Sequence, residues 1–127
     1  MAEVATLPQA VQAYFNTVNR KAFEETADLF AEDGQLVPPF DKPIVGREAI
    51  ATYLKKEASD MTFTPMACEP AEVDSSMGES FAVKGKVKNS LFVVNVSWQF
   101  DVQETGEIAS VKVKLLASLK ELMNLRS

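Results

Sequence analysis

The sequence has no histidine among its 127 residues. Histidine is the commonest metal ligand and the usual general base, and it completes the Ser/His and Cys/His pairs of nucleophilic enzymes. Its absence excludes imidazole metal centres and removes most catalytic templates at once.

Cysteine is almost as scarce, because Cys68 is the only one. An internal disulfide is therefore impossible. A lone cysteine is most often a small, partly buried hydrophobic residue with a plain thiol. The alternative is a disulfide to a second chain, and the sequence leaves that open.

Long apolar runs and an excess of positive charge are also missing. No stretch approaches the roughly 20 apolar residues of a bilayer-spanning helix, and the acidic Glu3 stands where a secretory signal would be basic. The formal net charge is −5, which repels phosphate backbones. Lys84, Lys86 and Lys88 do alternate along a predicted strand, but such alternation is typical of the solvated face of a sheet. We expect one cytoplasmic domain over residues 1–127, with neither a nucleic-acid partner nor a membrane span.

The residues that are present change their periodicity part-way along the chain. Helical spacing predicts helices at residues 7–20, 22–33 and 47–58, and period-two alternation predicts strands at 61–73, 79–88, 91–103 and 107–116. A short strand is expected near residues 35–37 and a short closing helix at residues 118–125. The turns between the four long strands suit hairpins, which predicts an antiparallel meander. Three prolines within residues 38–46 forbid helix there, and Gly46 frees the chain to turn into the next helix.

This order indicates an α+β fold in which a bent antiparallel sheet wraps on N-terminal helices and a short C-terminal helix follows. It is similar to the cone-shaped fold named for nuclear transport factor 2, and such cones enclose an apolar cavity. Alternation along residues 92–102 puts Trp98 on the inward face, and Tyr14 lies on the apolar stripe of the first helix. Both side chains carry a hydrogen-bond donor that needs an acceptor when buried. The two donors either converge on one ligand oxygen or each bond a backbone carbonyl as ordinary core aromatics.

Dispersed motifs favour the first alternative. Residues 38–46, 69–72, 85–87, 115–118 and 120–122 resemble the C-terminal domain of the orange carotenoid protein. The likeness spans nearly the whole chain and is greatest to stand-alone homologues of that domain in cyanobacteria. It implies a ketocarotenoid ligand such as canthaxanthin or echinenone, whose keto oxygen is hydrogen-bonded by the Tyr and Trp that Tyr14 and Trp98 match. It also implies a role in carotenoid transfer and singlet-oxygen quenching, with no enzymatic activity and no metal.

Apolar residues from the elements around the expected cavity are the candidates for contact with the pigment. These are Val18, Phe30, Pro39, Phe40, Ile44, Val45, Phe63, Phe92, Val113 and Leu115. A domain of this size has a radius of gyration of only about 14 Å, so it cannot cover a rod-like carotenoid. We therefore expect a homodimer, or a helical carrier like the N-terminal domain of the family that receives the pigment. The resemblance also places Glu57 at a family carboxylate that pairs with an arginine of that helical domain.

Two other functions remain in view. The same cone hosts isomerases and dehydratases that place a carboxylate base opposite a phenolic donor in an apolar pocket. A carboxylate beside Tyr14 would favour such an enzyme. A lumen filled by side chains would instead favour an association module without a ligand.

Overall fold

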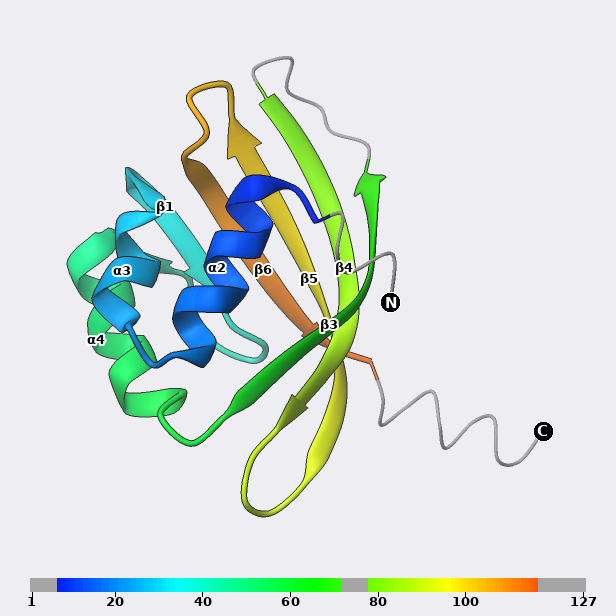
Figure 1. Ribbon diagram of the computed structural model, residues 1–127. Helices are drawn as coiled ribbons and strands as arrows, with labels where there is room; N and C mark the ends of the chain where they lie inside the picture. Colours follow the sequence, from blue (N-terminus) through cyan, green and yellow to red (C-terminus); the bar gives the residue numbers. More distant parts are fainter. Residues whose placement is uncertain (1–6, 72–77, 117–127) are drawn as a thin grey trace.

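The computed structural model describes residues 7–71 and 78–116, and Figure 1 shows helices packed on one face of a bent sheet. The helices are α2 (Gln9–Asn19), α3 (Phe23–Asp28) and α4 (Arg47–Glu57). The strands are β1 (Phe30–Val37), β2 (Ile44–Val45), β3 (Thr62–Ala71), β4 (Gly78–Lys88), β5 (Val93–Gln103) and β6 (Ile108–Leu115). The α+β class is confirmed. The closing helix expected at residues 118–125 lies outside the described residues.

The first and third predicted helices are confirmed within two residues at each end. Helix α2 buries Val11, Tyr14, Phe15 and Val18, the stripe that helical spacing indicated. Helix α4 begins directly after Gly46, whose φ of 97° lies in the left-handed region that glycine adopts without strain. The proline-rich segment therefore ends in a helix start, as predicted.

The second predicted helix is too long, because α3 ends at Asp28 and Phe30 already belongs to β1. The amide of Ile108 donates to the carbonyl of Leu29 at 2.9 Å, and Phe30 pairs with Ile108 in the sheet. Sheet pairing with a distant strand thus overrides the local spacing that placed Phe30 on a helical stripe. The short strand expected near residues 35–37 is in fact the end of this eight-residue strand.

The sheet is mixed, with strand order β2-β1-β6-β5-β4-β3. The antiparallel pairing of β3, β4, β5 and β6 is confirmed. A purely antiparallel sheet is wrong, because β1 pairs with β6 in parallel. Turn signals in the sequence report only the pairing of strands that follow one another along the chain. Strands β1 and β6 are separated along the chain by β2, α4, β3, β4 and β5, so no turn signal reports their pairing.

The two faces of the sheet differ sharply in chemistry. The inner face carries Val83, Val96, Trp98, Phe100 and Val111, each at most 2% exposed. The outer face carries five lysines that alternate along β4 and β6: Lys84, Lys86, Lys88, Lys112 and Lys114. All five are exposed, so the expectation of a solvated strand face is confirmed. The Asp101 carboxylate on this face accepts hydrogen bonds from Ser80 and Ser110, which links β4, β5 and β6.

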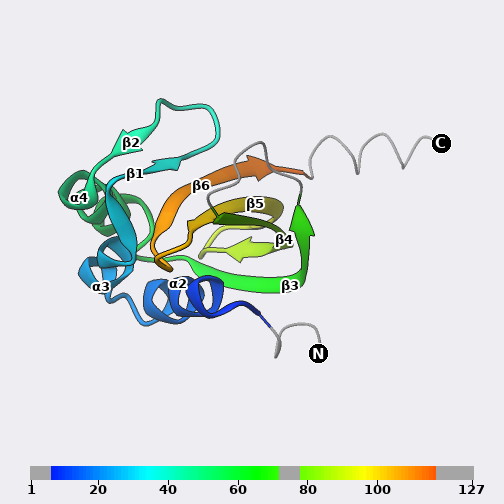
Figure 2. The same ribbon diagram turned by 90° about the horizontal axis from the view of Figure 1, so that it is seen from above.

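Strand β3 curls toward the helices, as Figure 2 shows from above. The Asn19 side chain at the end of α2 binds both backbone groups of Phe63: its amide donates to the carbonyl and its oxygen accepts from the amide, each at 2.8 Å. A bulge in β3 between Pro65 and Ala67 lies opposite Gly85 of β4. A Cβ at Gly85 would lie 2.1 Å from the Thr64 carbonyl oxygen, so only glycine fits this close approach.

Candidate ligand cavity

An apolar cavity of about 290 Å³ opens at one end of the bent sheet, where β4 turns into β5. Its wall is made by α2, α4, the inner face of β3 to β6 and the proline segment. The lining residues are Tyr14, Leu36, Pro38, Pro39, Tyr53, Leu54, Glu57, Ala58, Met61, Phe63, Val87, Asn89, Phe92, Val94, Val96, Trp98, Val113 and Leu115. The volume lies near the lower end of ligand pockets, roughly 300–1,000 Å³. It suits one ring of a ligand rather than a long chain.

Tyr14 and Trp98 both line this cavity, the first from α2 and the second from β5. Each residue is at most 2% exposed. Within the described residues, the Tyr14 hydroxyl and the Trp98 indole N–H make no hydrogen bond. Every side-chain polar atom that is fully buried in this part of the chain does have a hydrogen-bond partner. The two donor atoms therefore keep accessible surface, and that surface faces the cavity. Each group can donate a hydrogen bond to an acceptor that enters the cavity.

A frame of aromatic rings fixes these two donors. Phe15 packs edge-on against Tyr14 with centroids 5.3 Å apart, and against Trp98 at 4.8 Å. Phe100 packs edge-on against Tyr14 at 5.1 Å. Edge-to-face pairs of this kind add stability and fix ring orientation. The rings that carry the two donors are thus fixed by packing.

Burial raises the pKa of the Tyr14 phenol well above its ordinary value, and the neighbouring phenol of Tyr53 adds to this effect. The hydroxyl consequently keeps its proton at neutral pH. Tyr14 is a hydrogen-bond donor rather than a base.

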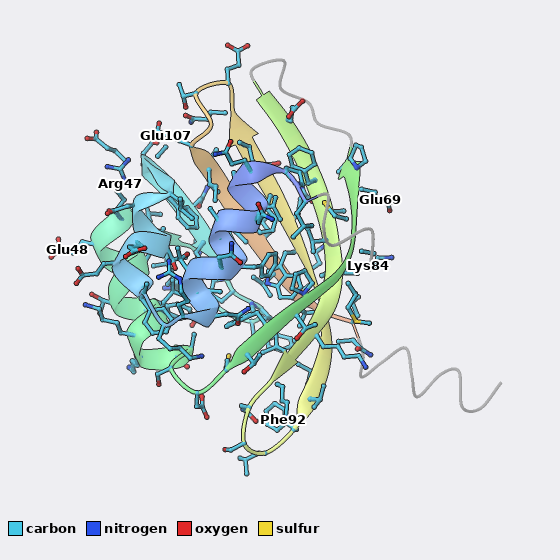
Figure 3. The ribbon with its side chains drawn as sticks, in the orientation of Figure 1. Arg47, Glu48, Glu69, Lys84, Phe92 and Glu107 are labelled. Atoms are coloured by element: carbon cyan, nitrogen blue, oxygen red, sulfur yellow. The ribbon has the colours of Figure 1, made fainter. Side chains whose placement is uncertain are left out.

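The mouth of the cavity is unusually apolar for an exposed surface. Leu91 is 82% exposed and Phe92 55%, and Figure 3 shows Phe92 at the tip of the β4–β5 hairpin. Asn89 fixes this turn, because its side-chain oxygen accepts hydrogen bonds from the amides of Leu91 and Phe92 at 2.7 and 2.9 Å. Leu115 lies on the wall at the end of β6 and is 40% exposed. An exposed apolar patch around a cavity mouth is typical of a binding surface.

Seven of the twelve residues predicted from the sequence line the cavity: Tyr14, Pro39, Phe63, Phe92, Trp98, Val113 and Leu115. The prediction that they contact a pigment stays a prediction.

Five predicted residues lie elsewhere. Val18 and Phe30 are completely buried in the packed core and are not on the cavity wall. Phe40 is 92% exposed in the proline segment, with a φ of 62°. Ile44 and Val45 line a shallow surface hollow beside α4 instead. Apolar spacing identifies the side chains that avoid water, but it does not identify those that border an empty space.

Sequence reasoning missed the contribution of α4, which supplies Tyr53, Leu54, Glu57 and Ala58 to the wall. The signal was present, because residues 53, 54, 57 and 58 share one helical face. Tyr53 is half-buried, and burial raises the pKa of its phenol, with smaller contributions from the Glu57 and Asp41 carboxylates. Glu57 is exposed at the rim.

Other features of the described residues do not form a comparable site. A hollow of about 830 Å³ at the opposite end of the sheet is bordered by carboxylates of Asp28, Glu79, Glu104 and Glu107. No group of three or more Cys, Asp or Glu in the described part of the chain is placed to hold a metal ion.

No described helix has the length and apolarity to cross a membrane. Burial, aided by the Glu69 carboxylate, raises the pKa of the free Cys68 thiol, so the thiol stays protonated.

Comparison with known proteins identifies the family to which this chain belongs. The model of the SnoaL-like domain matches residues 11–111. The chain belongs to the SnoaL-like domain family. It is also a homologue of the orange carotenoid-binding protein and matches that protein's C-terminal domain, which has the nuclear transport factor 2-like fold.

The orange carotenoid-binding protein of Synechocystis is 35% identical to this chain over 117 residues, which cover 87% of this chain and 36% of that protein. The structure of the Anabaena (Nostoc) orange carotenoid protein binding canthaxanthin is 35% identical, covers 91% of this chain and 38% of that chain, and has a TM-score of 0.79. The chain thus spans little more than a third of these relatives. A ketosteroid isomerase-like protein from Erwinia carotovora, 21% identical over 91% of this chain and 97% of that chain with a TM-score of 0.62, shares the fold alone.

Proposed function

We propose that this SnoaL-like domain binds a ketocarotenoid, with canthaxanthin or echinenone as the expected ligands. One observation carries the proposal: the Tyr14 hydroxyl and the Trp98 N–H face one small apolar cavity without a partner among the described residues. A keto oxygen is an acceptor with two lone pairs and can take both hydrogen bonds. Homology to a protein whose solved structure holds canthaxanthin agrees with this chemistry.

Burial of the terminal ring supplies most of the affinity. Apolar area contributes about 25 cal/mol per Å², whereas each hydrogen bond adds about 0.5–1.5 kcal/mol. The two donors orient the ring and draw electron density toward the keto oxygen, which shifts the absorption of the conjugated chain to the red. Their buried, neutral state keeps this effect constant across physiological pH.

The polyene must leave through the apolar mouth, because the cavity holds only about 290 Å³. Phe92 and Leu115 border its exit and are themselves exposed, and Leu91, the neighbour of Phe92 in the chain, is exposed as well. A second copy of this chain or a helical carotenoid carrier would bury both the pigment and these side chains. We therefore propose a homodimer that holds the pigment and transfers it to or from such a carrier, with quenching of singlet oxygen as a property of the bound polyene.

The direct test is to co-express the full chain with enzymes that make canthaxanthin, and to record the visible spectrum of the purified protein. Coloured protein with a red-shifted band is expected. Trp98→Phe should blue-shift the band while uptake is largely preserved, because one donor is lost and the ring still fits. Phe81→Leu, on the inner face but outside this cavity, is the matched control and should leave the band unchanged. Colourless wild-type protein would reject pigment binding.

The enzyme alternative has one observation in its favour, since Glu57 borders the cavity. Its carboxylate is exposed on α4, however, next to Tyr53 rather than Tyr14. A general base must lie within hydrogen-bond reach of the proton that it removes. Binding without catalysis is therefore the better account of this cavity.

A further inference from the structure

Tyr53 places a second phenol on the wall of the cavity that holds Tyr14 and Trp98. It comes from α4, whereas Tyr14 comes from α2, so the two phenols reach the cavity from different helices. Like Tyr14, Tyr53 makes no hydrogen bond through its hydroxyl within the part of the chain that the structure describes. Glu57 follows one helical turn later, on the same face of α4 and on the same cavity wall.

The two polar groups of α4 differ in chemistry from the pair already described. The Trp98 N–H can only donate, and the neutral Tyr14 phenol meets the same oxygen as a donor. Tyr53 can donate or accept, and the Glu57 carboxylate can only accept. An alcohol needs both kinds of partner, because its hydroxyl donates one hydrogen bond and accepts others. The α4 side of the cavity therefore matches a hydroxyl, whereas the Trp98 side matches a ketone.

The small volume requires both polar groups of the ligand to be on the same ring. At about 290 Å³ the cavity accommodates little more than the terminal ring of a carotenoid. A hydroxyl on a ring in this apolar cavity would lose its hydration, which is costly unless a protein group replaces it. Tyr53 and Glu57 are the side chains on the wall that can accept from this hydroxyl, since the side-chain oxygen of Asn89 already accepts two backbone hydrogen bonds.

We propose that Tyr53, assisted by Glu57, forms a subsite for a hydroxyl on the ring carbon next to the keto group. The cavity then prefers a hydroxyketo ring, such as the ends of astaxanthin, over the plain keto ring of canthaxanthin. This inference rests on the proposed carotenoid binding and adds to it the class of ring that the cavity selects. A site that is built to hydrogen-bond a hydroxyl discriminates against the ligand that lacks it.

The test is a competition between astaxanthin and canthaxanthin for the full chain, scored by the ratio of the two pigments that co-purify. One hydrogen bond gained corresponds to a preference for astaxanthin of roughly 2- to 12-fold. Tyr53→Phe should bring the ratio close to one without shifting the band of bound canthaxanthin, because the keto oxygen is held by Tyr14 and Trp98. Glu57→Leu should lower the ratio in part, and Glu57→Gln, which keeps an acceptor oxygen, should lower it less. Thr52→Val, exposed on the same helix, is the matched control.

Any other outcome of this competition rejects either the proposed pigment binding or the hydroxyl subsite. A wild-type chain that binds neither pigment contradicts the proposed function itself. A chain that binds both pigments with a ratio of one, or with a ratio that Tyr53→Phe leaves unchanged, contradicts the subsite alone. If Tyr53→Phe weakens both pigments equally, Tyr53 is a packing residue of the wall and the subsite is rejected.

Discussion

The inner face of the sheet has two halves with the same alternating sequence pattern. One half is packed with side chains and is called the filled half, and the other borders the cavity and is called the hollow half. In the filled half, Phe100 packs against Tyr14 and Phe15, and neither Phe100 nor its cross-strand neighbour Val111 has accessible surface. In the hollow half, Val94 and Val113 lie on the same strands but border the cavity. Both halves are apolar, so hydrophobicity alone does not create the cavity.

The difference arises from what covers each half. Aromatic side chains of α2 pack into the filled half, where Tyr14 and Phe15 contact the Phe100 ring. The hollow half is bordered by α4, where Tyr53 and Leu54 line the wall together with the small Ala58 and the rim residue Glu57. Rings of α2 therefore fill the first half, whereas the rings in the second half, such as Phe63 and Tyr53, stand around the cavity as its wall.

A matched pair of substitutions on β6 tests this comparison with the largest expected effect. Val111→Ala should lower the free energy of unfolding by about 2–3 kcal/mol, because it opens a void in the filled half. Val113→Ala removes the same atoms two residues later, but it should cost only about 1 kcal/mol or less because its side chain already borders a cavity. Urea denaturation of both variants gives the difference. Equal losses would show that the hollow half is packed in solution.

The attachment of β3 over the hollow half depends on Asn19, which makes two hydrogen bonds with the backbone of Phe63. Asn19→Ala should cost about 1–2 kcal/mol, since these bonds are partly exposed to water. Asn16→Ala, exposed one turn earlier on α2, is the control and should have almost no effect. Hydrogen exchange should also become faster in β3 with the Asn19 variant; unchanged exchange there would contradict this role.

The smallest effect is expected at alkaline pH. Burial raises the pKa of Tyr14, so the folded chain keeps a proton that the unfolded chain releases above pH of about 10. Stability from this term is complete below that pH and decreases as the pH rises further. Thermal melts from pH 8 to 11 should show a decline that is shallower in Tyr14→Phe. A decline of equal slope in both proteins would place the Tyr14 hydroxyl in water rather than in the cavity wall.

Most of the fold, but only part of the cavity, could be predicted from the sequence. Strand alternation placed Trp98 inward, and helical spacing placed Tyr14 on the buried stripe of α2, because both patterns follow directly from backbone geometry. Neither pattern separates a filled position from one that borders a void, so Val18 and Phe30 were predicted to line the cavity but lie in the core. The parallel pairing of β1 with β6 was also missed, since it joins segments about 75 residues apart through contacts that no local signal specifies.

Gly85 has a consequence for any attempt to alter the ligand range of this domain. The Thr64 carbonyl occupies the space where a side chain at position 85 would begin, and this contact lies beside the bulge at which β3 changes register. Replacement of wall residues such as Val87 or Val113 changes the shape of the lumen, whereas any substitution at position 85 would force the edge strand outward. Mutagenesis aimed at new pigments should therefore vary the side chains of the lumen and keep position 85 as glycine.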